Sequence, residues 1–95
     1  MDISENIKIR LQEKGKRYYA NDNISEYISE EEKGLLIEEV AKKFEGVLDS
    51  LVIDRHNDPN SHDTGKRLAK MYINEIMAGR YNPPPKCTAF PNESK

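Results

Sequence analysis

The sequence predicts a mainly α-helical protein with three helices and an extended, proline-rich tail. Apolar residues recur every three to four positions at about 2–19, 30–52 and 64–78, which is the spacing of one helix face. Three consecutive prolines at 83–85 cannot continue a helix and favour extended backbone. The chain has 95 residues, so we expect one small domain: a helical head at 1–82 followed by a tail at 83–95.

The first predicted helix covers residues 2–19. Ile3, Ile7, Leu11 and Tyr18 share one stripe, and we expect this stripe to dock on the second helix. Gly15 should weaken the last turn by about 1 kcal/mol relative to alanine. The connector that follows, residues 20–28, contains short polar side chains that are typical of turns.

The second predicted helix, residues 30–52, has the clearest periodicity. Ser29 and Glu32 have the spacing of a capping box, in which each side chain bonds to the other residue's backbone N–H. The apolar residues cover an arc of roughly 140°, which is the width of a core-facing helix stripe. They are Leu36, Ile37, Val40, Ala41, Phe44, Val47, Leu48 and Leu51.

The third predicted helix covers residues 64–78. Thr64 is predicted to cap its start, since a threonine hydroxyl can accept a bond from an unpaired backbone N–H. Gly79 is predicted to supply the left-handed residue that ends it. The narrow polar side of the helix exposes three basic residues, Lys66, Arg67 and Lys70.

The apolar side of the third helix is unusually wide, at roughly 220°. A helix this apolar normally meets more than one neighbour, which points to a partner subunit or to a part of the fold outside this chain. Glu75 falls inside the arc, and it either pairs with a basic or backbone donor or contacts a partner. The predicted interface residues are Leu68, Met71, Tyr72, Glu75 and Ile76.

The loop at 53–63 holds both histidines and several aspartates, so a metal site has to be considered. The spacing of His56 and His62 fits no helical ligand pair. We therefore favour a solvated loop and predict no metal ligand.

The third helix also resembles a known family. Its pattern Asp63-Thr64-x-x-Arg67-x-Ala69-Lys70-Met71-Tyr72-x-Asn74-Glu75-Ile76-x-x-Gly79 is similar to the signature helix of GTP cyclohydrolase I. The resemblance continues through Tyr81 and Pro85-Lys86-Cys87-Thr88 to Phe90-Pro91-Asn92, and reaches back more weakly to about Glu31. The family usually has proline where Gly65 stands, so we expect a softer helix start.

This resemblance implies a helical head followed by a tunnelling-fold sheet, assembled into a ring with active sites between subunits. The family hydrolyses GTP to dihydroneopterin triphosphate in one-carbon metabolism, for tetrahydrofolate (pterin) or deazapurine biosynthesis. Its zinc is held by two cysteines and a histidine, in part through a Cys-x-x-His pair. Here Phe90 stands three residues after Cys87, so Cys87 does not match a zinc ligand.

We therefore predict no catalytic residue and no cofactor in this chain. On the resemblance, GTP and zinc belong to the intact family, whose catalytic half follows the point where this chain stops. The expected partners are further copies in a homo-oligomer or a complementary catalytic half. The alternative is a stand-alone protein-binding module that pairs with enzyme subunits or with another host protein.

Composition argues against other partners. The net charge of −2 gives no global field that would attract nucleic acid, and three exposed basic residues would bind it weakly. No apolar run is long enough to span a membrane, and a single cysteine cannot form an internal disulfide. The cytoplasm is the expected location.

Overall fold

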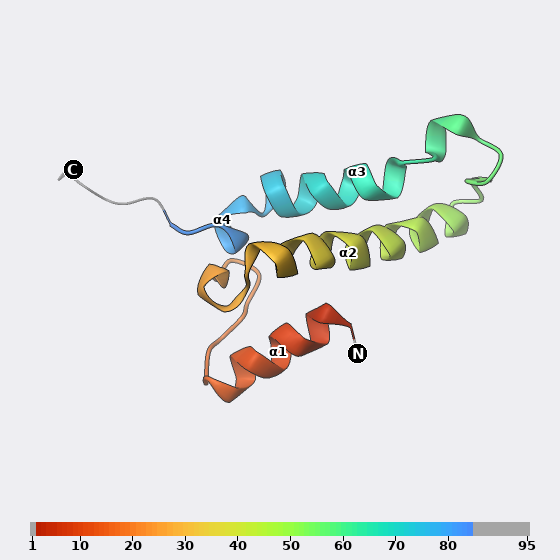
Figure 1. Ribbon diagram of the computed structural model, residues 1–95. Helices are drawn as coiled ribbons and strands as arrows, with labels where there is room; N and C mark the ends of the chain where they lie inside the picture. Colours follow the sequence, from red (N-terminus) through yellow and green to blue (C-terminus); the bar gives the residue numbers. More distant parts are fainter. Residues whose placement is uncertain (1, 85–95) are drawn as a thin grey trace, which may run out of the picture.

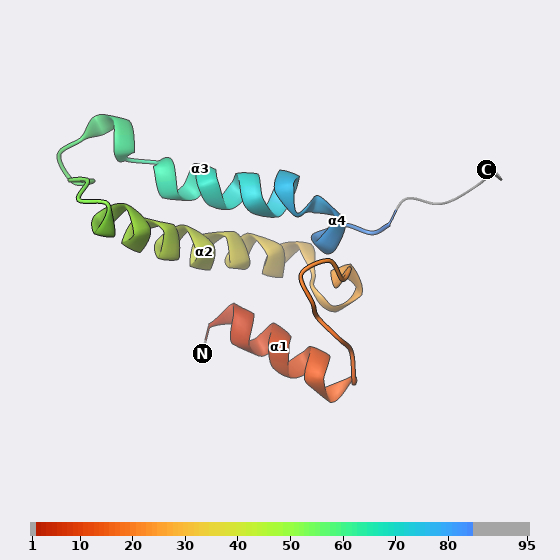
Figure 2. The same ribbon diagram turned by 180° about the vertical axis from the view of Figure 1, so that it is seen from behind.

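The computed structural model describes residues 2–84, and within them the chain is helical and contains no strand. Helix α2 (Glu30–Ser50) lies between α1 (Ile3–Glu13) and α3 (Thr64–Met71), and α2 and α3 form an antiparallel hairpin (Figures 1 and 2). The π-helix η3 (Tyr72–Ile76) and the short α4 (Ala78–Tyr81) continue α3. The predictions for residues 85–95, including Cys87, lie outside the described residues.

Helix α1 ends at Glu13, so the prediction of a helix to residue 19 is wrong. Gly15 has a φ of 65°, the left-handed conformation that glycine adopts without strain. Its N–H donates to the Gln12 carbonyl at 3.0 Å, and the next N–H donates to the Leu11 carbonyl at 2.9 Å. These two bonds form a Schellman motif, which terminates the helix. Gly15 thus ends α1 instead of only weakening it.

Helix α2 begins as predicted. The Ser29 hydroxyl accepts from the Glu32 N–H at 3.0 Å, and the Glu32 carboxylate accepts from the Ser29 N–H at 3.0 Å. The capping box is therefore confirmed. The helix ends at Ser50, two residues before the predicted boundary of 52. A second Schellman motif ends it: the Val52 N–H donates to the Asp49 carbonyl at 3.0 Å, and the Ile53 N–H donates to the Leu48 carbonyl at 3.2 Å.

Val52 occupies the left-handed position of this motif, with a φ of 66° and 91% of its surface exposed. A β-branched residue is strained in this conformation, because its Cβ approaches the following carbonyl oxygen. Since Val52 contributes little burial, we expect Val52→Gly to raise the free energy of unfolding by about 1 kcal/mol. Urea unfolding measures the change. Lys42→Gly, at an exposed position inside α2, is the opposite control and should lower stability by about 1 kcal/mol. A loss in both variants would contradict the strain at Val52.

The third helical stretch differs from the prediction at both ends. Thr64 is already the first residue of α3, and its hydroxyl donates to the Asn60 carbonyl at 3.2 Å without capping the helix. The short 3₁₀ turn at Pro59–Ser61 leads into the helix, so the chain is helical before a threonine cap could act. Gly79 lies inside α4 without a positive φ, so it is not the predicted left-handed end. The break falls instead at Met77, with φ −109° and ψ 29°.

A small apolar core joins α1 to the connector. Ile7, Leu11 and Ile24 are almost fully buried, and Tyr18 and Tyr81 pack against them. Polar contacts fix α1 on α2: Arg10 donates twice to Glu32, at 2.8 and 2.7 Å, and the Glu39 carboxylate accepts from the Ser4 N–H at 3.0 Å. Glu39 thereby satisfies an unpaired N–H in the first turn of α1.

Helices α2 and α3 approach each other at small residues. Ala69 is fully buried, and a Cβ added to Gly65 would lie 2.9 Å from the Ala41 carbonyl oxygen and 3.0 Å from Glu45 Cγ. Gly65 therefore marks the close crossing of two helices. This is a packing role, in addition to the softer helix start that the sequence suggested.

Candidate assembly surface

Helix α2 carries two adjacent apolar stripes. The first includes Ala41 and Leu48, which are buried, and the Gly65 contact shows that the Ala41 side faces α3. The second lies one residue earlier in each turn, about 100° around the axis. It comprises Val40 and Phe44, which are half-buried, and Val47 and Leu51, which are 51% and 63% exposed.

Helix α3 and its π-helical extension repeat this arrangement. Ala69 and Ile73 are buried, whereas Leu68 and Tyr72, one residue earlier in each case, are half-buried and 39% exposed. Ile76 lies seven residues after Ala69. In an unbroken α-helix seven residues make about two turns, so Ile76 would face α2 as Ala69 does. The π turn is wider, so each residue rotates less and Ile76 swings toward Tyr72, where it is 59% exposed.

The two uncovered stripes lie on the same side of the hairpin. The Phe44 and Tyr72 rings meet across α2 and α3, with centroids 5.4 Å apart. Because the helices are antiparallel and each stripe lies one residue before a facing one, helical geometry turns both stripes to the same side. We name this surface the apolar flank: Val40, Phe44, Val47, Leu51, Leu68, Tyr72 and Ile76.

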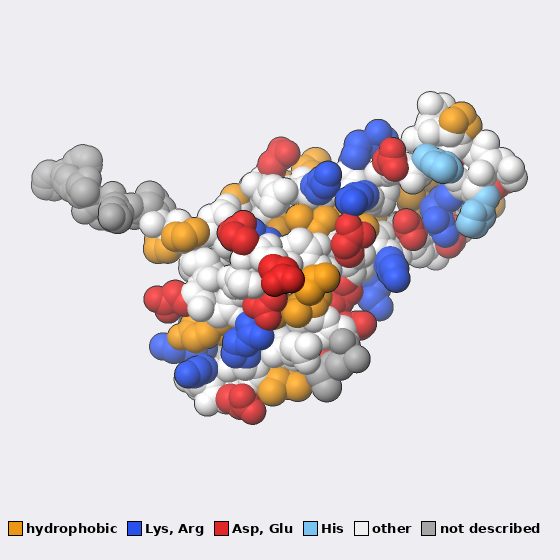
Figure 3. Space-filling model, viewed as in Figure 1, with side chains coloured by type: hydrophobic (Ala, Val, Ile, Leu, Met, Phe, Trp, Pro, Cys, Tyr) orange, Lys and Arg blue, Asp and Glu red, His pale blue; other side chains and the backbone are white. Residues whose placement is uncertain are grey.

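The opposite side of the hairpin is charged. Lys66 of α3 pairs with Glu38 of α2 at 3.0 Å, and Arg55 pairs with Asp49 at 2.7 Å. Figure 3 shows a charged face of the hairpin, on which acidic and basic side chains are interspersed along α2 and α3. The two sides of the hairpin therefore differ in chemistry.

The predicted interface residues fall into two groups. Leu68, Tyr72 and Ile76 come together on the apolar flank, while Met71 is half-buried. Glu75 is exposed, which does not fit a partly buried, paired carboxylate. The other reading, contact with a partner, stays a prediction. Lys66, Arg67 and Lys70 are exposed as predicted.

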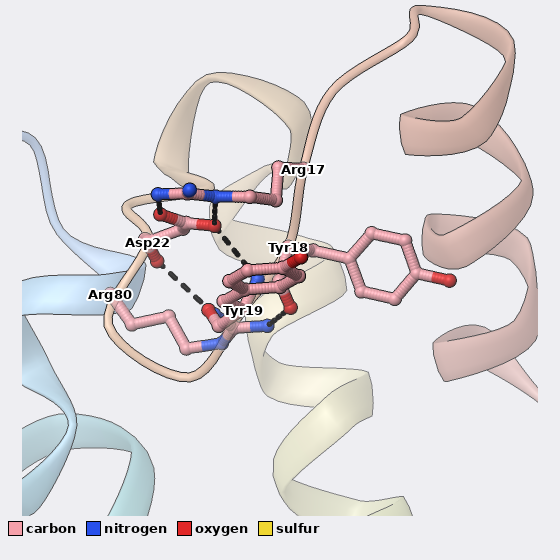
Figure 4. Close-up of polar contacts among 5 residues, drawn as sticks. All are labelled: Arg17, Tyr18, Tyr19, Asp22 and Arg80. Carbon is pink, nitrogen blue, oxygen red and sulfur yellow. Dashed lines mark hydrogen bonds and ion pairs between the residues drawn. The ribbon is translucent and has the colours of Figure 1, made fainter.

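A polar cluster that the sequence did not reveal fixes the end of this surface to the connector. Arg80 of α4 donates to the backbone carbonyls of Tyr19, Asp22 (3.1 Å) and Tyr18 (3.4 Å), as Figure 4 shows. The Ile24 N–H donates back to the Arg80 carbonyl at 2.8 Å. No periodicity or motif in the sequence predicts this cluster. Arg80 lies about 60 positions from its partners, and its side chain contacts their backbone carbonyls.

Two carboxylates are held ionised by arginines. Hydrogen bonds from Arg17, and then from the Tyr19 N–H, lower the pKa of Asp22 to about 2. Hydrogen bonds from Arg10, and then from the Ser29 N–H, lower the pKa of Glu32 to about 2. The Arg10–Glu32 pair joins α1 to the start of α2, whereas the Arg17–Asp22 pair lies within the connector.

These shifts predict an acid-labile fold. The pKa of Glu32 is lower in the folded state than its ordinary value of 4.5, so its contribution is present above that value and is lost as the pH falls toward about 2. We expect Glu32→Gln to lower the melting temperature at about pH 6, and the difference from wild type to shrink toward about pH 2. Circular dichroism follows both. Glu31→Gln, in the same turn, is the control; a Glu32→Gln difference independent of pH would contradict the assignment.

Both histidines lie at one surface depression. His56 and His62 line an open depression of about 270 Å³ with Asn57 and Pro59. Among residues 2–84, no three histidine, cysteine or carboxylate side chains are placed to hold a metal ion. Within the same residues, no helix has the length and hydropathy required to cross a membrane.

Comparison with known proteins finds no relative: no protein-family model, curated protein or solved structure matches this chain. The resemblance to GTP cyclohydrolase I therefore stays a prediction from residue order.

Proposed function

We propose that this chain is a non-catalytic assembly module, similar to the N-terminal helical part of GTP cyclohydrolase I and located in the cytoplasm. One observation carries the proposal: the stretch that resembles the family's signature helix packs on α2 and still leaves Tyr72 and Ile76 exposed and Leu68 half-buried. Contiguous apolar side chains at a surface mark sites of protein association. Further copies, or a complementary catalytic half, would cover them.

The departure at Gly65 fits this role. Any residue with a Cβ there, including the proline usual in the family, would approach the α2 backbone too closely. Gly65 therefore lets α3 lie close to the α2 backbone. Zinc and GTP would be bound by the intact family's catalytic half, and we assign no step to either in residues 2–84.

Two measurements on the purified chain test the proposal. We expect no turnover of GTP and no stoichiometric zinc by elemental analysis. Turnover, or one zinc ion per chain, would contradict it. Mixing the chain with GTP cyclohydrolase I subunits then tests the assembly role: comigration on size exclusion supports it, and stable binding only to an unrelated host protein would favour the stand-alone alternative.

A further inference from the structure

A small apolar cavity lies where four segments of the chain meet. Its volume is about 120 Å³, it is partly open to solvent, and α1, the connector, α2 and α4 all contribute to its walls. Its floor consists of Ile7 and Leu11 of α1, Ile24 of the connector and Leu36 of α2, each no more than 7% exposed. The cavity is therefore continuous with the core that joins α1 to the connector.

Two tyrosines form side walls of this cavity, and polar contacts hold both rings in place. The Tyr18 ring points from the connector toward α1, as Figure 4 shows, and its hydroxyl accepts a hydrogen bond from the Gln12 side chain at 2.9 Å. The guanidinium carbon of Arg80 lies 5.8 Å from the centroid of the Tyr81 ring. Since three backbone carbonyls fix Arg80 in turn, the walls are pre-formed, as those of ligand-binding sites usually are.

The charges at the cavity are basic. Lys8 of α1 and Arg80 of α4 line it, and among the described residues that line it none carries a carboxylate. Lys8 is exposed, and the ion pairs found within residues 2–84 include neither Lys8 nor Arg80. The Arg80 side chain donates only to neutral backbone carbonyls. The cavity thus combines an apolar interior with two cations that can attract an anion.

Carboxylates close to these segments are already bonded to other groups. Glu39 accepts from the N–H and the hydroxyl of Ser4, at 3.0 and 2.5 Å. Asp22 accepts two hydrogen bonds from the Arg17 side chain, at 2.9 and 2.8 Å. An anion could therefore bind beside Lys8 without displacing an ion pair.

We propose that this cavity binds a small amphipathic carboxylate, an anion that carries one aromatic ring or a short branched alkyl chain. The apolar part lies in the cavity between Tyr18 and Tyr81, and the carboxylate lies beside Lys8 and Arg80. An apolar cavity of about 150 Å³ accommodates benzene, so a volume of about 120 Å³ limits the apolar part to about one ring. None of the lining residues belongs to the apolar flank, so this inference is independent of the assembly role.

Titration of the isotope-labelled chain with phenylacetate, followed by nuclear magnetic resonance, tests the proposal. We expect saturable shifts at the lining residues, including Leu11 and Ile24, with a dissociation constant of about 1 mM, which a ligand of this size can reach. Phenylacetamide has the same ring without the charge. It should bind about fivefold more weakly at low salt, because it gains nothing from the two cations.

Three variants locate the site. Lys8→Gln should weaken phenylacetate binding about threefold at low salt and leave phenylacetamide binding unchanged. Lys14→Gln is the matched control, because Lys14 is also exposed, follows the end of α1 and does not line the cavity. Leu36→Phe would fill the cavity and should abolish binding of both compounds. Circular dichroism shows whether this variant is folded, and Lys8→Gln, a surface change, decides the question if it is not.

Several results would overturn the proposal. One is the absence of saturable shifts at phenylacetate concentrations up to about 20 mM, well above the expected dissociation constant. Equal affinity for phenylacetate and phenylacetamide would show that the cations do not select an anion. Shifts away from the lining residues, an equal effect of Lys8→Gln and Lys14→Gln, or unchanged binding by a folded Leu36→Phe variant would each place the ligand elsewhere.

Discussion

Gly65→Ala is expected to lower the free energy of unfolding by about 1–3 kcal/mol, although alanine favours helices. The added Cβ would lie 2.9 Å from the Ala41 carbonyl oxygen, a backbone atom that cannot rotate away, and 3.0 Å from Glu45 Cγ. Helix α3 would have to move off α2, which would loosen the contact around Ala69, a fully buried residue of α3. Urea denaturation followed by circular dichroism measures the loss.

Gly46→Ala is the matched control. Gly46 lies inside α2, and a Cβ there would meet nothing within 4 Å. We expect this change to raise stability by about 1 kcal/mol through helix propensity alone. Both variants need one fixed protein concentration, because association would shift apparent stability. Equal gains in the two variants would show that α2 and α3 do not approach closely at Gly65.

Helix α2 could be predicted from sequence because its signals are local. Ser29 and Glu32 are three residues apart, and the apolar stripes recur with the helix period over the whole element. Burial, periodicity and capping all favour the same structure there. The long helix and its start therefore follow from neighbouring residues alone.

The ends of the other helices could not be predicted in the same way. Gly15 and Gly79 look alike in sequence, yet one takes a positive φ and ends α1, and the other stays helical in α4. Glycine permits the left-handed conformation without requiring it. Packing and hydrogen bonds determine which glycine adopts it. At Val52 they stabilise the left-handed conformation in a β-branched residue, for which it is unfavourable.

The candidate surface was predicted in part. The stretch 64–76 has a buried apolar side, at Ala69 and Ile73, and a second apolar stripe beside it that includes Leu68 and Tyr72. The π turn was not predicted, because no residue pattern in the sequence marks its i→i−5 hydrogen bond, from the Met77 N–H to the Tyr72 carbonyl at 2.8 Å. Both Ile76 and Glu75, which lie in that turn, are exposed.

Contacts across the length of the chain were also beyond sequence reasoning, and Arg80 is the main example. Removing its guanidinium with Arg80→Met leaves the carbonyls of Tyr19, Asp22 and Tyr18 without this donor. Hydrogen bonds from a charged group contribute more than neutral ones, so we expect a loss of about 2 kcal/mol. The methionine keeps most of the aliphatic stem, which limits the change in packing.

Arg67→Met is the control for this substitution, since Arg67 is exposed on α3 and its contact with the Thr64 hydroxyl, at 3.5 Å, stays within its own helix. It should change stability by no more than about 0.5 kcal/mol. Hydrogen exchange adds a local measurement: Arg80→Met should speed exchange of the Ile24 N–H, which donates to the Arg80 carbonyl, more than that of amides in the middle of α2. Uniform acceleration of exchange along the chain would mean that Arg80 supports the whole fold. Unchanged exchange at Ile24 would mean that other contacts hold α4 to the connector. One such contact is the hydrogen bond that the Asn23 side chain donates to the Asn82 carbonyl, at 2.7 Å.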